Sequence, residues 1–389
     1  MSNHPKVIFG ISGSISAYKS LDIIRLLRKQ NVVIHPVLST SAHKFVTPWS
    51  VESLSETSLL SDDVIDGKIT HLEACKHSNL FVVCPASANL IAKLASGRAD
   101  DLLTSTFLSF TGKKIIFPAM HTEMYENKIT QANIQRLKES GVIIIEPTDG
   151  ELACGDTGKG RLPDVNLIAD IIQSAHLPSV DLSNKRITIT CGGTTEPIDP
   201  VRAITNHATG RSGHVMANMA TLFGAKVCLI RTNSAPTLDG INTINVNTAD
   251  EMKEALFAQA PHTDLLLMNA AVSDFQVKNS SASKLKRGEL RTLDLVPTED
   301  ILEHFNRIKP NNCKSIGFCL HDSDDLINIA KEKRIKKGCD IIIANDATSF
   351  GKPNRTVHII DDKSVNSYEN IDLYELSYKA LHSFNLYNL

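Results

Sequence analysis

The sequence lacks an excess of positive charge, closely paired cysteines and any long apolar run. Its 41 Lys and Arg residues against 43 Asp and Glu give a formal net charge of only -2, whereas nucleic-acid and membrane-surface binders usually carry a basic patch. None of its eight cysteines forms a C-x-x-C pair, which excludes a small disulfide framework and favours a reducing compartment. No apolar run approaches the roughly 20 residues of a membrane span, and no signal segment precedes the first strand pattern. We therefore expect a soluble, cytoplasmic protein that binds neither nucleic acid nor membrane.

Two common ligand-binding patterns are also absent. The stretch LACGDTGKGRL, residues 152–162, contains three glycines and a lysine, but not at the spacing of a phosphate-binding P-loop. Its one cysteine, Cys154, has no second cysteine or histidine within about five residues, as a metal site would require. A small buried thiol beside a turn and a reactive thiol on a moving loop both stay open. The second half lacks the G-x-G-x-x-G fingerprint, which weakens the case for an NAD-dependent oxidoreductase.

What is present is an alternation of short apolar segments with amphipathic helical patterns. The apolar segments are residues 6–10, 32–38, 80–85, 113–119 and 141–147 in the first half, and 186–191, 225–230, 264–270, 314–318 and 340–345 in the second. Uninterrupted apolar strands that alternate with helices indicate parallel sheets covered on both faces. A polar connector around Pro178 separates the halves. We predict an α/β protein of two three-layer, Rossmann-like domains, 1–180 and 181–389.

Small polar residues follow three strands of the first half. They lie in GISGSISAYK (10–19), LSTSAHKF (38–45) and CPASAN (84–89). Because the carboxyl ends of parallel strands share one edge of a sheet, these segments should converge there. Gly13, Ser14 and Ile15 open a helix, whose free N–H groups favour an anion. Taken alone, the turn at Gly13 could equally serve packing, whereas the convergence favours a ligand site.

The motifs GISGSISAYK and CPASAN, together with three more, resemble those of a known family. THLEA (70–74), PAM-x-x-x-M (118–124) and ACGD-x-G-x-GR (153–161) complete a set that, in this order, is similar to the flavin-dependent cysteine decarboxylases. The second half narrows the resemblance to the bifunctional phosphopantothenoylcysteine decarboxylase and phosphopantothenate-cysteine ligase family of coenzyme A synthesis. The resemblance implies a flavodoxin-like flavin domain followed by a nucleotide-binding ligase domain.

For the first half, the resemblance implies an FMN-dependent decarboxylation. Cys154 would lie on a flap and protonate the enethiolate left after carboxylate loss, a task that suits a thiol with an adjustable pKa. His71 would act near flavin and substrate in the oxidative step. His121 stands where the family usually has an asparagine that binds the substrate carboxylate, and a histidine can also donate hydrogen bonds there. The expected FMN contacts are Gly13, Ser14, Ile15, Ser39, Ser41, Ser87, Ala88 and Asn89.

For the second half, clustered lysines suit either a solvated face or a polyphosphate site. The resemblance implies that CTP and Mg²⁺ activate the carboxylate of 4'-phosphopantothenate as an acyl-cytidylate, which the amine of cysteine then attacks. Asn206 and Lys284 would be catalytic. The expected CTP contacts are Met268, Asn269, Ala270, Asp274, Lys284, Phe318, Lys333 and Lys337. The run GFCLHDSDDL is one residue longer than the corresponding run of the family. The match of Lys333 and Lys337 to the family's nucleotide contacts therefore depends on where the extra residue is placed.

The implied product is 4'-phosphopantetheine, made from 4'-phosphopantothenate, cysteine and CTP. The resemblance also implies a homo-oligomer in which flavin-domain trimers and ligase-domain dimers build a larger assembly, such as a dodecamer. Two alternatives stay open: a ligase whose flavin domain is impaired by His121, and a non-catalytic flavoprotein regulatory subunit. Retention of Cys154 argues against the second alternative. The sequence does not identify which residues would bind the Mg²⁺ ion.

Overall fold

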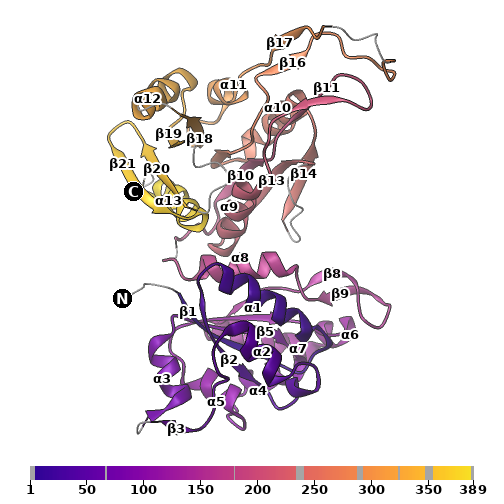
Figure 1. The fold of residues 1–389 in the computed structure, drawn as a ribbon, viewed down its shortest axis with the longest axis vertical. Coiled ribbons are helices and arrows are strands. Elements are labelled where there is room, and N and C mark those ends of the chain that lie inside the picture. The colour runs from indigo at the N-terminus through magenta and orange to yellow at the C-terminus, as the bar shows by residue number, and fades with distance from the viewer. Residues whose placement is uncertain are drawn as a thin grey trace. The chain divides into compact units, whose positions relative to one another are not determined.

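The structure is a computed structural model that describes residues 5–65, 68–178, 180–233, 241–286, 292–322, 325–346 and 354–386. It divides into two compact units, 1–176 and 177–389, a few residues before the boundary predicted at 180 and 181. No helix among the described residues combines the length and the apolarity needed to cross a membrane. Each unit is built on a sheet of mainly buried parallel strands (Figure 1).

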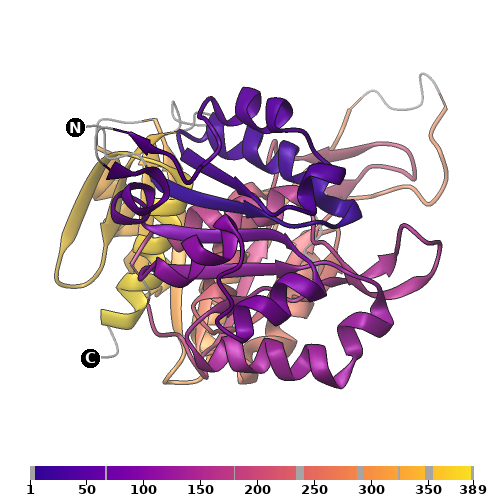
Figure 2. The same ribbon diagram turned by 90° about the horizontal axis from the view of Figure 1, so that it is seen from below.

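The first unit contains a five-stranded parallel sheet in the order β2-β1-β5-β6-β7. Its strands are β1 (Lys6–Ile11), β2 (Val33–Leu38), β5 (Leu80–Ala86), β6 (Lys113–Pro118) and β7 (Ile143–Ile144). All seven residues of β5 are buried, because helices cover both faces of this sheet, as Figure 2 shows. The last strand is shorter than the apolar run at 141–147 predicts.

Eight α-helices and two short 3-10 helices are described in the first unit. They are η1 (Ile15–Tyr18), α1 (Lys19–Lys29), η2 (Ala42–Lys44), α2 (Pro48–Ser55), α3 (Thr70–His77), α4 (Ala88–Ala95), α5 (Leu102–Ser109), α6 (Thr122–Glu126), α7 (Lys128–Glu139) and α8 (Val165–Ala175). The hydroxyl of Ser87 caps α4, and Asp101 forms a capping box at α5. Two helices therefore begin at fixed points beside the carboxyl ends of the strands.

Residues 148–161 form a β-hairpin, where the sequence predicts only a glycine-rich loop. The hairpin pairs β8 (Thr148–Glu151) with β9 (Thr157–Arg161), and a second small ladder pairs β3 (Val64–Ile65) with β4 (Lys68–Ile69). Cys154 lies in the hairpin turn, which closes through a bond from the amide of Leu152 to the carbonyl of Asp156 (2.8 Å). Gly155 has a φ of +92°, which a residue with a side chain rarely adopts.

The second unit contains an eight-stranded sheet in the order β14-β13-β10-β15-β18-β19-β20-β21. The six parallel strands are β10 (Arg186–Cys191), β13 (Lys226–Thr232), β14 (Asn242–Val246), β15 (Leu265–Met268), β18 (Lys314–His321) and β19 (Ile341–Asp346). The last two strands, β20 (Arg355–Ile360) and β21 (Val365–Ile371), pair with their neighbours in antiparallel orientation. These two strands were not predicted from the sequence.

The helices of the second unit are α9 (Arg211–Leu222), α10 (Ala249–Gln259), η3 (Ala260–His262), α11 (Ile301–Ile308), α12 (Leu326–Lys337) and α13 (Leu373–Leu386). A Cβ on Gly213 of α9 would lie 2.3 Å from the Cβ of Cys191 in β10, so only glycine allows this close packing. Two hairpins extend side by side beyond β10 and β15 (Figure 1). They pair β11 (Thr195–Pro197) with β12 (Ala203–Thr205), and β16 (Phe275–Val277) with β17 (Leu295–Pro297).

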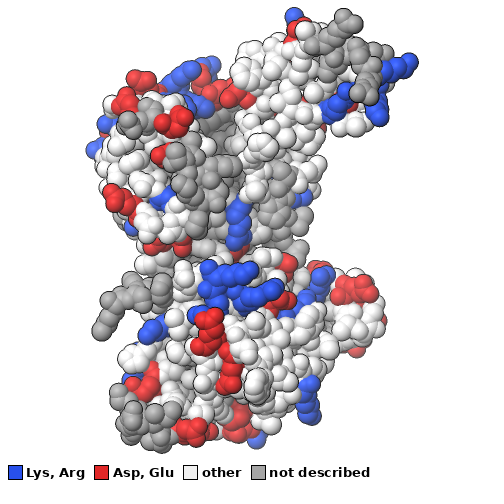
Figure 3. Space-filling view, in the orientation of Figure 1, with Lys and Arg blue, Asp and Glu red and all other residues white. Residues whose placement is uncertain are grey.

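Charged side chains of both signs lie on the face drawn in Figure 3. Over α1, for example, Arg25 pairs with Asp22, and Arg28 pairs with Glu56 from the end of α2. Exposed pairs of this kind contribute little to stability. Their mixture of signs agrees with the nearly neutral net charge of the chain.

Candidate functional site

A cavity of about 420 Å³ opens where the strands of the first unit end; we call it the polar cavity. It lies beside the ends of β1, β2 and β5, the edge at which α/β sheets bind ligands. Its lining includes all eight residues predicted to contact the flavin: Gly13, Ser14, Ile15, Ser39, Ser41, Ser87, Ala88 and Asn89. The structure thus brings three separate sequence segments to one site.

The polar cavity is built to accept a polar or anionic group. A Cβ on Gly13 would lie 2.4 Å from the Cβ of Ser41, so the two strand-end turns approach as closely as a glycine permits. The hydroxyl of Ser39 is buried and has no hydrogen-bond partner among the described residues, which is unusual for a buried polar atom. Helix α4 begins at Ala88 beside the cavity and directs the positive end of its dipole there. These features fit the phosphate and polar edge of a flavin nucleotide.

A second cavity, of about 520 Å³, adjoins the first; we call it the thiol cavity. The two cavities share Ser14, Ile15, Ala119 and Met120 as lining residues. The thiol cavity is also lined by His121 and, from the β8–β9 hairpin, by Cys154. The structure therefore places a thiol and an imidazole in one cavity, next to the cavity that fits the flavin.

Glycines fix the hairpin against the segment that carries His121. The amide of Met120 donates to the carbonyl of Gly160 (3.1 Å), and a Cβ on Gly160 would lie 2.2 Å from the carbonyl oxygen of Met120. A Cβ on Gly158 would lie 2.5 Å from the hydroxyl of Thr122. The glycines of the motif are thus explained by close backbone approach between β9 and the start of α6.

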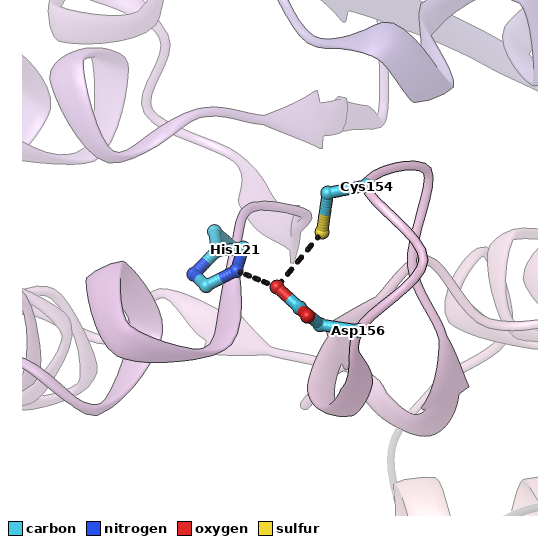
Figure 4. A group of neighbouring side chains, drawn as sticks. All are labelled: His121, Cys154 and Asp156. Carbon is cyan, nitrogen blue, oxygen red and sulfur yellow. Dashed lines mark hydrogen bonds and ion pairs between the residues drawn. The ribbon is translucent and has the colours of Figure 1, made fainter.

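Asp156 connects the thiol with the imidazole (Figure 4). Its Oδ2 lies 2.9 Å from Nε2 of His121 and 3.4 Å from Sγ of Cys154. The hydrogen bond with His121, and secondly that with Cys154, lower the pKa of the Asp156 carboxyl. An ionised carboxylate only accepts, so His121 donates through Nε2–H and Cys154 through S–H. Cys154 and His121 are thus hydrogen-bonded to one carboxylate, an arrangement suited to proton transfer.

The same three side chains could also hold a metal ion, because their ligand atoms all lie within 4.8 Å of one another. Asp156 was not singled out by the sequence analysis, although it stands two residues after Cys154 in the motif. Lys19 and Arg161 were missed as well, and both line the thiol cavity. Burial lowers the pKa of Lys19, and the positive charge of Arg161 lowers it further.

His71 is not brought to either cavity within one chain. It lies on α3, where its Nδ1 is 3.5 Å from a carboxylate oxygen of Asp62, and its side chain is only 13% exposed. Its neighbours Thr70 and Glu73 line a separate cavity of about 1160 Å³. This cavity shares only Thr40 and Asp101 with the polar cavity.

In the second unit, Asn206 lies at the carboxyl end of β15. Its Nδ2 donates to the carbonyls of Ala271 (3.2 Å) and Val272 (3.1 Å). A Cβ on Gly193 would lie 2.8 Å from the carbonyl oxygen of Asn206, so the Gly-Gly turn after β10 makes room for it. Met268, Asn269 and Ala270 immediately precede the contacted carbonyls, and the amide of Ala270 donates to the hydroxyl of Thr190 (3.1 Å). Asn206 and the strand-end segment are thus brought together.

The remaining predicted residues lie on several elements of the second unit. Phe318 follows Gly317, which pairs with Met268 across neighbouring strands. Exposed Asp274 precedes β16, and exposed Lys284 lies in the segment that follows this strand. Lys333 and Lys337 lie on α12. Nζ of Lys337 is 3.2 Å from a carboxylate oxygen of Asp300, the residue that caps α11.

Comparison with known proteins matches both units to families. The family model described as "DNA/pantothenate metabolism flavoprotein C-terminal domain" matches residues 182–384, and the model "Flavoprotein" matches residues 1–177. The "Coenzyme A biosynthesis bifunctional protein CoaBC" of Borreliella burgdorferi is 34% identical over 389 residues, which cover 98% of this chain and 99% of the relative. The protein of the same name from Mycobacterium bovis is 35% identical over 87% of this chain and 85% of its own length. That from Vibrio vulnificus is 35% identical over 89% and 88%.

Proposed function

The chain belongs to the family of bifunctional coenzyme A biosynthesis proteins, and we propose that it makes 4'-phosphopantetheine from 4'-phosphopantothenate and cysteine. The second unit would first join the two substrates at the expense of CTP. The first unit would then decarboxylate the product with FMN. The observation that carries this proposal is the Cys154–Asp156–His121 contact in a cavity that adjoins the polar cavity.

In the first unit, the eight residues of the polar cavity would hold FMN. FMN held there would supply reversible hydride transfer at the carbon that bears the substrate thiol. His121 would bind the substrate carboxylate until carbon dioxide leaves, the role that asparagine has in the resembling family. Cys154 would donate its S–H proton to the enethiolate that remains. The hairpin would exclude water from this intermediate, since it forms one wall of the thiol cavity.

The second unit would catalyse the ligation with CTP and Mg²⁺. Lys284 would offset the charge that develops on the α-phosphate as pyrophosphate leaves, which is how cationic groups favour phosphoryl chemistry. Asn206, held at the end of β15, would contact the acyl-cytidylate. Met268, Asn269, Ala270, Asp274, Phe318, Lys333 and Lys337 complete the expected CTP site. The pair of Lys337 with Asp300 would have to open for Lys337 to reach the nucleotide.

The position of His71 supports a homo-oligomeric first unit. A residue that acts in the oxidative step must approach the substrate, and His71 lines neither cavity of its own chain. We infer that a neighbouring copy supplies it, in keeping with the expected trimer. Inactive His71→Asn and Cys154→Ser proteins, unfolded together and refolded as mixed oligomers, should regain part of the decarboxylase activity. Mixed oligomers as inactive as their parents would contradict the sharing of a site.

The direct test is to incubate the purified protein with 4'-phosphopantothenate, cysteine, CTP and Mg²⁺ and to identify the products by mass. We expect 4'-phosphopantetheine, CMP and pyrophosphate. Accumulation of 4'-phosphopantothenoylcysteine would mean that the flavin unit is impaired. Absence of both products would contradict the proposal and favour a non-catalytic role.

A further inference from the structure

The turn between β11 and β12 contains a buried carboxylate that has no part in the proposed ligation or decarboxylation. Asp199 is only 4% exposed. Its Oδ1 accepts from the amides of Val201 (2.8 Å) and Arg202 (2.9 Å), and its Oδ2 accepts from Nε of Arg202 (2.9 Å). Burial by itself would raise the pKa of Asp199, but these bonds and one from Leu285 outweigh it and lower the pKa to about 2. Asp199 is therefore a fixed, ionised anchor.

This anchor holds the segment that carries Lys284. The amide of Leu285 donates to Oδ2 of Asp199 (3.2 Å), and Nη2 of Arg202 donates to the carbonyl of Leu285 (2.8 Å). The amide of Ser281 donates to the carbonyl of Ile198 (2.9 Å). Residues 281–286 belong to no helix or strand, so these contacts hold in place a stretch that has no regular structure of its own. Lys284 adjoins the held residue, and its side chain is exposed.

The same turn is continuous with the residue expected to contact the acyl-cytidylate. Arg202 is followed by β12, and β12 is followed directly by Asn206, which is bonded to the end of β15. One short hairpin thus connects the Lys284 segment to the sheet edge where nucleotides are expected. A shift at Asp199 would move Lys284 relative to Asn206.

We propose that Asp199 is a positioning residue for acyl-cytidylate formation, which it supports by holding Leu285 so that Lys284 faces the nucleotide. This inference rests on the ligase function proposed above. Asp199 itself touches no substrate, because all of its acceptor positions are directed at the protein. Its effect on the reaction must therefore pass through Lys284.

The test measures pyrophosphate released from CTP by the full chain with 4'-phosphopantothenate and Mg²⁺ in the absence of cysteine. The Asp199→Asn protein should release it about 100-fold more slowly, the usual scale of a displacement near 1 Å. In a Lys284→Gln background, the added Asp199→Asn change should cause no further loss, because the lysine through which it acts is gone. Arg202→Lys keeps the positive charge but loses the planar guanidinium that contacts both Asp199 and Leu285. It should lower the rate of pyrophosphate release by a smaller factor.

A matched control is Asp264→Asn. Asp264 also accepts from an arginine side chain and a backbone amide, those of Arg186, but it lies at the opposite end of the sheet from Lys284. This protein should release pyrophosphate at the wild-type rate. The far-ultraviolet circular dichroism spectrum and the thermal unfolding curve of each variant report whether its second unit is folded, which decarboxylation by the first unit would not show.

Three results would overturn the inference while leaving the ligase function intact. The first is a wild-type rate for both Asp199→Asn and Arg202→Lys, and the second is a wild-type rate for Lys284→Gln. The third is an equal fold-loss from Asp199→Asn with and without Lys284. The last result would mean that Asp199 has only a structural role. If the wild-type protein itself releases no pyrophosphate, the proposed ligase function fails together with the inference. The two failures are therefore distinguishable.

Discussion

At the scale of single residues, the main finding is that the carboxylate of Asp156 lies between the thiol of Cys154 and the imidazole of His121. Asp156 accepts from both neighbours, so it provides a path along which a proton can pass between His121 and Cys154. The sequence motif predicts Cys154 and His121. It does not predict that Asp156 joins them, because the contact between positions 121 and 156 exists only after the hairpin folds back on α6.

The first prediction concerns Asp156. Replacing it with asparagine removes the acceptor charge, so we expect the kcat of decarboxylation to fall about 100-fold, within the range of general acid–base effects. The measurement is the rate of carbon dioxide release from 4'-phosphopantothenoylcysteine at saturating substrate. Asp22→Asn is the control, since Asp22 forms only an exposed pair with Arg25. A normal kcat for Asp156→Asn would exclude the proposed proton path.

At the scale of elements, the sequence predicts the buried parallel strands better than the hairpins. Continuous apolar runs led directly to β1, β5, β10 and β15, because strands covered on both faces need apolar side chains throughout. The three-residue strands of the β11–β12 and β16–β17 hairpins lie in polar segments, where pairing depends on tertiary contacts. For strands β20 and β21, the sequence feature that could have predicted a hairpin is the polar turn 361–364 between them. In this turn Asp361 accepts from two backbone amides.

The second prediction concerns the docking of the β8–β9 hairpin. Gly160→Ala would place a Cβ 2.2 Å from the carbonyl oxygen of Met120, so the hairpin must move and carry Cys154 away from His121. We expect the decarboxylase kcat to fall about 100-fold, as for a displacement near 1 Å. The ligase rate, measured in the same preparation, should not change. Gly97→Asn is the control, because a Cβ there meets nothing within 4 Å and its φ of +69° suits asparagine.

The third prediction concerns acid stability at the β11–β12 turn. The pKa of Asp199 is about 2 in the folded protein and about 3.9 in an unfolded chain, so the unfolded state binds more protons between these values. The stabilisation is therefore complete above about pH 4 and is lost as the pH falls toward 2. In urea unfolding, the stability difference between wild type and Asp199→Asn should shrink over this range. A difference independent of pH would contradict the assigned cause.

At the scale of the whole molecule, the two proposed activities belong to separate compact units, 1–176 and 177–389. The sequence predicts this organisation from the alternation of strands and helices in each half. The cavity residues also follow from the sequence, although their contact with FMN stays a prediction. The placement of His71 differs from the expectation, because within one chain it lines neither the polar cavity nor the thiol cavity.

The fourth prediction follows from this separation. A mixture of Cys154→Ser and Lys284→Gln proteins should convert 4'-phosphopantothenate and cysteine to 4'-phosphopantetheine, because the first variant makes the intermediate and the second consumes it. Product is measured by mass, with each variant alone as the control. If the mixture makes none while the wild type does, the intermediate does not pass through solution.

The exposed position of Cys154 also makes it accessible to chemical modification. It is the one exposed cysteine of the eight, and six others are buried. Burial raises the pKa of Cys191 to about 12 and that of Cys313 to about 11, so those thiols are poorly nucleophilic at neutral pH. A mild electrophile would therefore alkylate the hairpin tip selectively. The residue that would complete the decarboxylation is also the natural attachment point for a covalent inhibitor or a fluorescent reporter.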